Sequence, residues 1–189
     1  ACWVRLRVTG VTRNLTPQAH AHDREAGWSP DGRRVAFISD RSGDEAIYLV
    51  SQEGGEAKQL SNGKRGRINA PSWSPDSQQL AFIDHQGTLV VVDLTGKERE
   101  VVRNPYAQIN DYSWSPDSAW LAYTQPTESG IPAIFLWSRS SGESKLASDP
   151  FFVSFSPSFS PDGQYLYYIS DREFAPQIGS FEWNYVVDR

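Results

Sequence analysis

The stretch Trp28-Ser-Pro-Asp-Gly32 decides the fold, because it recurs as Trp73-Ser-Pro-Asp-Ser77, Trp114-Ser-Pro-Asp-Ser118 and Phe159-Ser-Pro-Asp-Gly163. The four copies begin 45, 41 and 45 residues apart. A period of about 40–45 residues is typical of the four-stranded blade of a β-propeller. A short run rich in β-branched and aromatic residues follows every copy, which indicates strands rather than helices.

Each copy has the composition of a tight turn between two strands. Proline presets φ near about −65° at the first central position, aspartate bonds its own backbone, and glycine or serine releases the chain. The aromatic residue before the turn stands at the same place in every repeat, and we interpret it as a wedge between neighbouring blades. The sequence thus assigns a structural role to eight residues of the turns and wedges: Trp28, Asp31, Trp73, Asp76, Trp114, Asp117, Phe159 and Asp162.

Many strand segments are apolar at successive positions, for example 35–38 and 89–92. A strand with one wet face would alternate, so both faces must be covered, and blades stacked around an axis provide that cover. We predict an all-β fold: a partial β-propeller of four-stranded antiparallel blades, with three complete blades and an incomplete blade at either end. The predicted units of this single domain are 1–17 (trailing half of a blade), 18–62, 63–104 and 105–149 (complete blades) and 150–189 (incomplete final blade).

The composition narrows the range of functions. The chain has 189 residues, 39% of them hydrophobic, and a formal net charge of −5, which gives no overall attraction to nucleic acid or an anionic membrane. Its apolar runs fall far short of the about 20 residues that a membrane helix needs. Cys2 is the only cysteine, which excludes an intramolecular disulfide or a zinc site of several cysteines. We predict neither a nucleic-acid nor a membrane partner. The absence of methionine at position 1 and an opening in the middle of a strand indicate a piece of a longer chain.

Residues with the chemistry of a catalytic or metal site are scarce. No Gly-x-Ser-x-Gly elbow occurs, and the available imidazole bases are His20, His22 and His85. His20 and His22 have a spacing that could aim two imidazoles at a metal, but no cluster of further ligands accompanies them, which favours solvated loop histidines. The sequence therefore predicts no catalytic, cofactor-binding or metal-binding residue in this chain, and no cofactor.

Three other motifs have both a structural and a functional interpretation. Asp40-Arg41 recurs as Asp171-Arg172, which favours an ion-pair or hydrogen-bond lock between blades over a binding role. Lys64-Arg-Gly-Arg67 is the only basic cluster along the sequence, and we expect an exposed loop between blades, with docking of an acidic group as the alternative. Asn14-Leu-Thr16 fits a glycosylation sequon, which matters only in a secretory setting.

The repeats resemble those of the TolB and tricorn protease group of β-propellers, whose blades carry a Trp-Ser-Pro-Asp-Gly turn and a Phe-x-Ser-Asp-Arg-type strand end. Nearly the whole chain resembles the second, larger propeller of a tricorn-type protease. The stretches that carry this resemblance are Arg13-Asn-Leu-Thr16, Arg24-Glu-Ala-Gly-Trp-Ser-Pro-Asp-Gly32, Ile47-Tyr-Leu-Val50, Asn104-Pro-Tyr106, Ile109-Asn-Asp-Tyr-Ser-Trp114, Leu166-Tyr-Tyr-Ile-Ser-Asp-Arg-Glu-Phe174 and Gly179-Ser-Phe-Glu-Trp-Asn-Tyr185.

The resemblance implies a non-catalytic propeller of a tricorn-like serine endopeptidase, which acts as an access channel or filter for unfolded peptides. It further implies a homo-oligomeric parent with its catalytic residues outside this chain, and a cytoplasmic location with the periplasm left open. A channel of fixed diameter needs no reactive group to exclude folded proteins. We expect its innermost strands near 24–28, 69–73, 110–114 and 153–159. The alternatives are a TolB-like propeller that serves as a scaffold for protein–protein interaction, and a propeller attached to a prolyl-oligopeptidase-like hydrolase.

Overall fold

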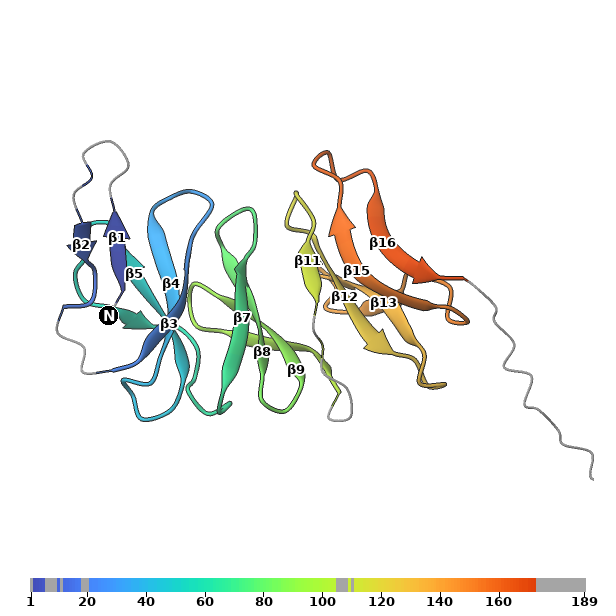
Figure 1. Ribbon diagram of the computed structural model, residues 1–189, viewed down its shortest axis with the longest axis horizontal. Coiled ribbons are helices and arrows are strands. Elements are labelled where there is room, and N and C mark those ends of the chain that lie inside the picture. The colour runs from blue at the N-terminus through green and yellow to red at the C-terminus, as the bar shows by residue number, and fades with distance from the viewer. Residues whose placement is uncertain are drawn as a thin grey trace, which may run out of the picture.

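The computed structural model describes residues 2–5, 10, 12–17, 21–104, 109 and 111–172. Three antiparallel sheets of four strands follow one another along the chain (Figure 1). Within each sheet the strands are ordered as in the sequence, so each is a simple meander. Among the described residues no helix is long and apolar enough to cross a membrane.

We call the three four-stranded sheets blades 1, 2 and 3. Blade 1 consists of β3 (Asp23–Trp28), β4 (Arg34–Ser39), β5 (Ala46–Ser51) and β6 (Lys58–Gln59). Blade 2 consists of β7 (Ile68–Trp73), β8 (Gln79–Asp84), β9 (Thr88–Asp93) and β10 (Glu98–Arg103). Blade 3 consists of β11 (Tyr112–Trp114), β12 (Trp120–Pro126), β13 (Pro132–Ser138) and β14 (Ser144–Leu146).

A two-stranded sheet flanks the three blades on either side. The N-terminal sheet pairs β1 (Trp3–Arg5) with β2 (Thr12–Asn14), and the final sheet, which we call blade 4, pairs β15 (Val153–Phe159) with β16 (Leu166–Asp171). In the part of the chain that the structure describes, this order of two, four, four, four and two strands confirms the predicted all-β fold of antiparallel four-stranded blades with a shorter sheet on either side. Residues 173–189 of the predicted final blade lie outside the described residues.

The first strand of every blade, β3, β7, β11 or β15, is an edge strand of its sheet, and these strands face the same side of the row (Figure 1). β3 contacts β7, and β11 contacts β15. A β-bulge interrupts three of them at the same place, within 24–27, 69–72 and 155–158. Glu25 and Ser156 lie in these bulges with φ of 51° and 56°. Such bulges turn side chains away from the plain alternation of a strand.

The hydrophobic core lies between adjacent sheets. Ala36 and Ile38 on one face of β4 belong to a cluster that blade 2 completes, whereas Phe37 on the opposite face belongs to a cluster that Leu15, the residue after β2, completes. A third cluster joins blades 2 and 3 around Trp114. Because both faces of the middle strands are buried, β4, β5, β8 and β9 carry continuous apolar runs.

Candidate functional site

Each Ser-Pro-Asp turn is closed by the side chains of its own serine and aspartate. In the first turn the Ser29 hydroxyl donates to Oδ1 of Asp31 at 2.6 Å and accepts the backbone N–H of Arg34 at 3.0 Å. Oδ1 of Asp31 also accepts the backbone N–H of Arg33 at 3.0 Å. The same three bonds recur in the other repeats around Asp76, Asp117 and Asp162.

These bonds keep the four turn carboxylates ionised. The hydrogen bond from the turn serine lowers the pKa of Asp31, Asp117 and Asp162 below its usual range. At Asp76 burial acts to raise the pKa, but the hydrogen bonds that it accepts, that of Ser74 first, outweigh burial and lower it. A carboxylate stabilised in this way holds no proton near neutral pH. The turn aspartates therefore have the chemistry of turn locks and not of acid catalysts.

Two of the turns also bind the preceding blade. The hydroxyl oxygens of Ser77 and Ser118 accept the backbone N–H of Asp31 and Asp76, at 3.0 and 2.9 Å. Both serines are buried and have a φ of 60°, a conformation that favours glycine. The fourth turn has Gly163 at this position, with a φ of 71°. Serine thus occupies a strained position where its hydroxyl reaches the neighbouring blade.

The aromatic residues before the turns lie in different surroundings. Trp73 and Trp114 donate their indole Nε1–H to backbone oxygens on the first strand of the preceding blade, at 3.2 and 3.3 Å. Both also pack against the apolar clusters between blades. Trp28 is 49% exposed and Phe159 is half-buried. Two of the four aromatic residues therefore bridge neighbouring blades within the described chain.

Arg41 links the strands of blade 1 to one another. Its guanidinium donates to Oδ1 of Asp23 at 2.9 Å and lies over the rings of Phe37 and Tyr48, 5.0 and 4.7 Å from their centroids. Oδ2 of Asp23 accepts the hydroxyl of Thr16 at 2.8 Å, which ties the chain after β2 to blade 1. Burial acts to raise the pKa of Asp23, but the hydrogen bonds that it accepts outweigh burial and lower it. Arg41 therefore acts within blade 1, and its partner Asp23 makes the link to the N-terminal sheet.

The other residues singled out in the sequence are not gathered into a reactive centre in the described part of the chain. His22 is exposed and donates its backbone N–H to Asp40, and His85 is exposed beside the loop at 65–66. His20 lies outside the described residues. Thr16 of the sequon is buried. Among the described residues, no group of three His, Cys, Asp or Glu side chains is placed to hold a metal ion.

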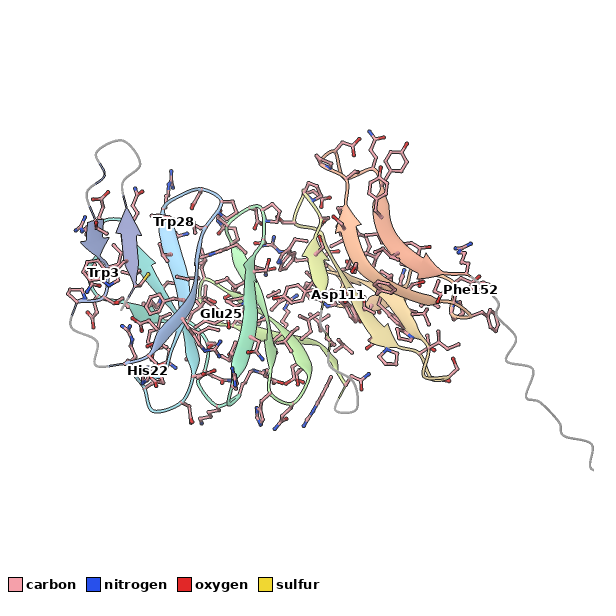
Figure 2. The ribbon with its side chains drawn as sticks, viewed as in Figure 1. Trp3, His22, Glu25, Trp28, Asp111 and Phe152 are labelled. Atoms are coloured by element: carbon pink, nitrogen blue, oxygen red, sulfur yellow. The ribbon has the colours of Figure 1, made fainter. Side chains whose placement is uncertain are left out.

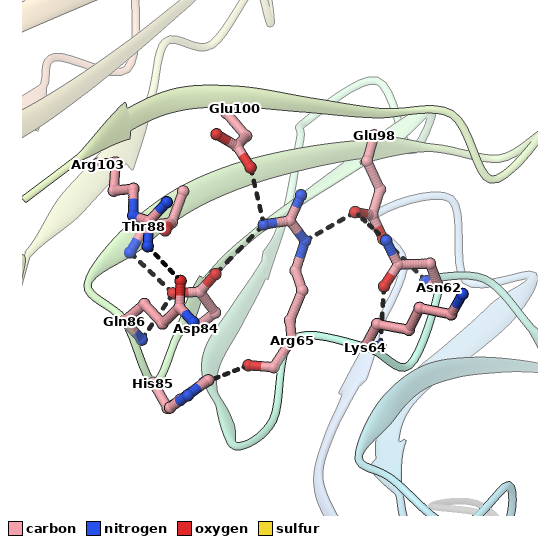
Figure 3. A network of polar contacts seen from close by, with 10 residues as sticks. All are labelled: Asn62, Lys64, Arg65, Asp84, His85, Gln86, Thr88, Glu98, Glu100 and Arg103. Carbon is pink, nitrogen blue, oxygen red and sulfur yellow. Dashed lines mark hydrogen bonds and ion pairs between the residues drawn. The ribbon is translucent and has the colours of Figure 1, made fainter. Parts of the chain in front are cut away.

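Arg65, in the middle of the basic cluster at 64–67, is paired with carboxylates of blade 2 (Figure 3). The guanidinium of Arg65 lies 2.7 Å from Glu98 and 3.2 Å from both Asp84 and Glu100. Burial acts to lower the pKa of Arg65, but these carboxylates outweigh burial and raise it. Arg65 thereby fastens the connection between blades 1 and 2 to β8 and β10. Its guanidinium is occupied and is not an open docking point for an acidic group.

If the first strands line a channel, as the sequence predicts, their exposed residues would form its surface. Glu25 and Ala26 on β3 and Asn69 on β7 are exposed. Asp111 precedes β11 at the position that corresponds to Glu25, three residues before the tryptophan (Figure 2). Its carboxylate accepts the backbone N–H of Ser156 in the bulge of blade 4. Sequence patterns located these strands, whereas the bulges that expose the side chains have no sequence signature of their own.

Consecutive four-stranded meanders, packed face to face with their first strands on a common side, define this chain as part of a β-propeller. The family model described as the tricorn protease second beta propeller domain matches residues 4–189. The chain belongs to this family, which confirms the resemblance drawn from the repeats.

The individual relatives are peptidases by name. The uncharacterized peptidase YuxL of Bacillus subtilis is 31% identical over 171 residues, which cover 87% of this chain and 24% of that protein. Tricorn protease homolog 1 of Streptomyces coelicolor is 29% identical over 176 residues, which cover 90% of this chain and 16% of that protein. The crystal structure of the tricorn protease is similar with a TM-score of 0.72 at 22% identity, covering 86% of this chain and 16% of that one. The chain thus spans a quarter or less of the curated relatives that it matches.

Proposed function

We propose that this chain is a non-catalytic part of a tricorn-like serine protease and that its inner strands line a path for unfolded peptides toward a catalytic centre elsewhere. The observation that carries the proposal is the placement of β3, β7, β11 and β15 on one side of the row, in a chain of this protease family (Figure 1). A homo-oligomeric parent and unfolded peptide substrates belong to the same proposal.

The edge strands have backbone groups that can bind an unfolded peptide in passage. In the described sheets every first strand pairs with a second strand on one side only, so its other edge presents backbone N–H and C=O groups. An extended peptide can bond transiently to such groups, whereas a folded protein cannot offer an extended backbone and is too wide for a pore of fixed size. Passage along these strands would select unfolded chains without any reactive side chain.

The test blocks the inner strands in the full-length protease. Ala26 is small and exposed on β3, so Ala26→Cys offers an attachment point for a bulky polyethylene glycol maleimide. The matched control is Lys145→Cys on β14, an exposed position on the last strand of blade 3. Cys2 is buried at 6% exposure, which limits its labelling, and other accessible cysteines of the parent are replaced beforehand.

We expect labelled Ala26→Cys protease to cleave an unfolded protein at least about tenfold more slowly than the unlabelled variant. This corresponds to an increase of about 1.4 kcal/mol or more in the activation free energy of cleavage. Labelled Lys145→Cys protease should keep its rate. Equal rates for labelled and unlabelled Ala26→Cys would refute the inner-strand path.

A further inference from the structure

A notch opens between blades 1 and 2 on the side of the Ser-Pro-Asp turns. It has a volume of about 370 Å³ and is lined by the start of β4, the end of β5, β6 and Leu94, which follows β9. Three cationic residues line it, Arg33, Arg34 and Lys58, and Glu56 is the only carboxylate among the lining residues. A volume of this size accommodates a few side chains of a bound peptide.

One of the cationic residues that line the notch has a side-chain nitrogen without an acceptor. Nη1 of Arg34 is buried and has no hydrogen-bond partner among the described residues. A buried donor without an acceptor is unfavourable, so a rotation of the Arg34 guanidinium that brings this nitrogen onto an acceptor of a bound ligand would be favoured. None of the three cations makes an ion pair in the described part of the chain, whereas the guanidiniums of Arg24, Arg41, Arg65 and Arg139 all do.

The backbone holds the three cations in place before any ligand arrives. The N–H of Arg34 donates to the Ser29 hydroxyl and its C=O accepts the N–H of Ser29, while the N–H of Arg33 donates to Asp31. Lys58 pairs with Leu49 across β5 and β6. Because these positions are fixed by the turn and the sheet, binding would order side chains only, which lowers its entropic cost.

The lining determines the kind of ligand. Three cations against one carboxylate call for an anion, and guanidiniums bind carboxylates through paired hydrogen bonds. Leu49 and Leu94, which pack in the apolar cluster between blades 1 and 2, add apolar surface beside the charges. We propose that this notch binds an acidic peptide segment in which carboxylates alternate with apolar side chains. No described residue of a first strand lines the notch, so the proposal is independent of the inner-strand path.

The repeats supply an internal control for this site. Arg34 pairs with Ser51 in blade 1 as Trp120 pairs with Ser138 in blade 3. Lys58 pairs with Leu49 as Lys145 pairs with Leu136. Blade 3 therefore keeps the lysine but has no arginine at the position of Arg34. A charge removed at Lys145 changes the net charge by the same amount as one removed at Lys58, without touching the notch.

The experiment measures fluorescence anisotropy of a fluorescein-labelled peptide of alternating glutamate and leucine with the full-length protein. The comparison peptide carries glutamine in place of glutamate, and inorganic phosphate serves as a competitor. We expect Arg34→Gln to weaken binding about tenfold and Lys58→Gln about threefold, with less than about a twofold change for Lys145→Gln. Lys58 is exposed, so Lys58→Gln tests the site even where Arg34→Gln impairs folding.

Preference for the glutamate peptide together with the ranking of the three variants supports the proposal. Equal binding of the glutamine peptide, or equal affinities of the wild-type and Lys58→Gln proteins, overturns it. Displacement of the peptide by phosphate at a concentration where chloride has no effect would identify a general anion site and would also overturn the assignment to a peptide.

Discussion

Replacing Ser77 by alanine removes a single bond between blades 1 and 2 and leaves the rest of the turn in place. The Ser77 hydroxyl accepts the backbone N–H of Asp31 at 3.0 Å, and Ser77 is only 2% exposed. A buried N–H that loses its acceptor costs about 1–3 kcal/mol. We therefore expect Ser77→Ala to lower the free energy of unfolding by about 1–3 kcal/mol.

A second substitution, Ser77→Gly, distinguishes the loss of the hydrogen bond from a general disturbance of the turn. Ser77 has a φ of 60°, which an alanine keeps at a cost of about 1 kcal/mol relative to glycine. Ser77→Gly loses the same hydrogen bond but relieves that strain, so we expect a loss of only about 0–2 kcal/mol. The glycine variant should therefore be more stable than the alanine variant, although glycine is the more flexible residue in the unfolded chain.

Amide hydrogen exchange in the full-length protein gives a local readout. The Asp31 amide should exchange about tenfold faster or more in Ser77→Ala. The Asp76 amide makes the equivalent bond to Ser118, and it should be unaffected, which makes it the matched control. Unchanged exchange at Asp31, equal acceleration at Asp76, or a glycine variant less stable than the alanine variant would each refute the reasoning.

Three further substitutions test other contacts between and within blades. Trp114→Phe keeps an aromatic ring but removes the hydrogen bond to the preceding blade, which should lower the free energy of unfolding by about 1–2 kcal/mol. An unchanged midpoint of urea unfolding would contradict this expectation. Arg41→Gln removes the guanidinium that binds the carboxylate of Asp23, 2% exposed, which should cost about 3 kcal/mol. Because the pKa of Asp23 is lowered in the folded protein, its contribution is complete above about pH 4 and is lost as the pH falls through the folded pKa. The wild-type protein should therefore lose stability on acidification more steeply than Arg41→Gln, and parallel pH profiles would contradict this. Arg65→Ala should cost about 3 kcal/mol, because Asp84, 3% exposed, keeps its hydrogen bonds from the backbone of Gln86 and Thr88 but loses its cation. An equal loss of stability in 1 M salt and in low salt would argue against an electrostatic cause.

The repeat made the architecture predictable, because the residues within each turn are sufficient to specify its bend. Proline, aspartate and serine within five residues specify the bend without help from distant parts of the chain, and the spacing of 41–45 residues then fixes the length of a blade. The continuous apolar run at 35–38 also predicted two covered faces, because each strand position faces one neighbouring sheet or the other.

The partners of individual charges were not predictable in the same way. Arg41 was expected to link blades, but its guanidinium binds Asp23 within blade 1. Arg65 belongs to the most basic stretch of the sequence, yet folding brings Glu98 and Asp84 from blade 2 onto it. Asp84 and Glu98 lie 19 and 33 residues further along the chain, so no local pattern reveals them.

Comparison of the four repeats distinguishes the positions that the fold requires from those that are available for function. Positions that must make the same bonds in every blade carry the same residue, as Asp31 and its three counterparts do. Equivalent positions that carry different residues in different blades do not make a side-chain bond that every blade requires. Arg34 is one of these, since its counterparts are Gln79, Trp120 and Tyr165. Because glutamine is already accommodated there in blade 2, Arg34→Gln should spare the fold, and a loss of peptide binding in this variant would report on the notch itself.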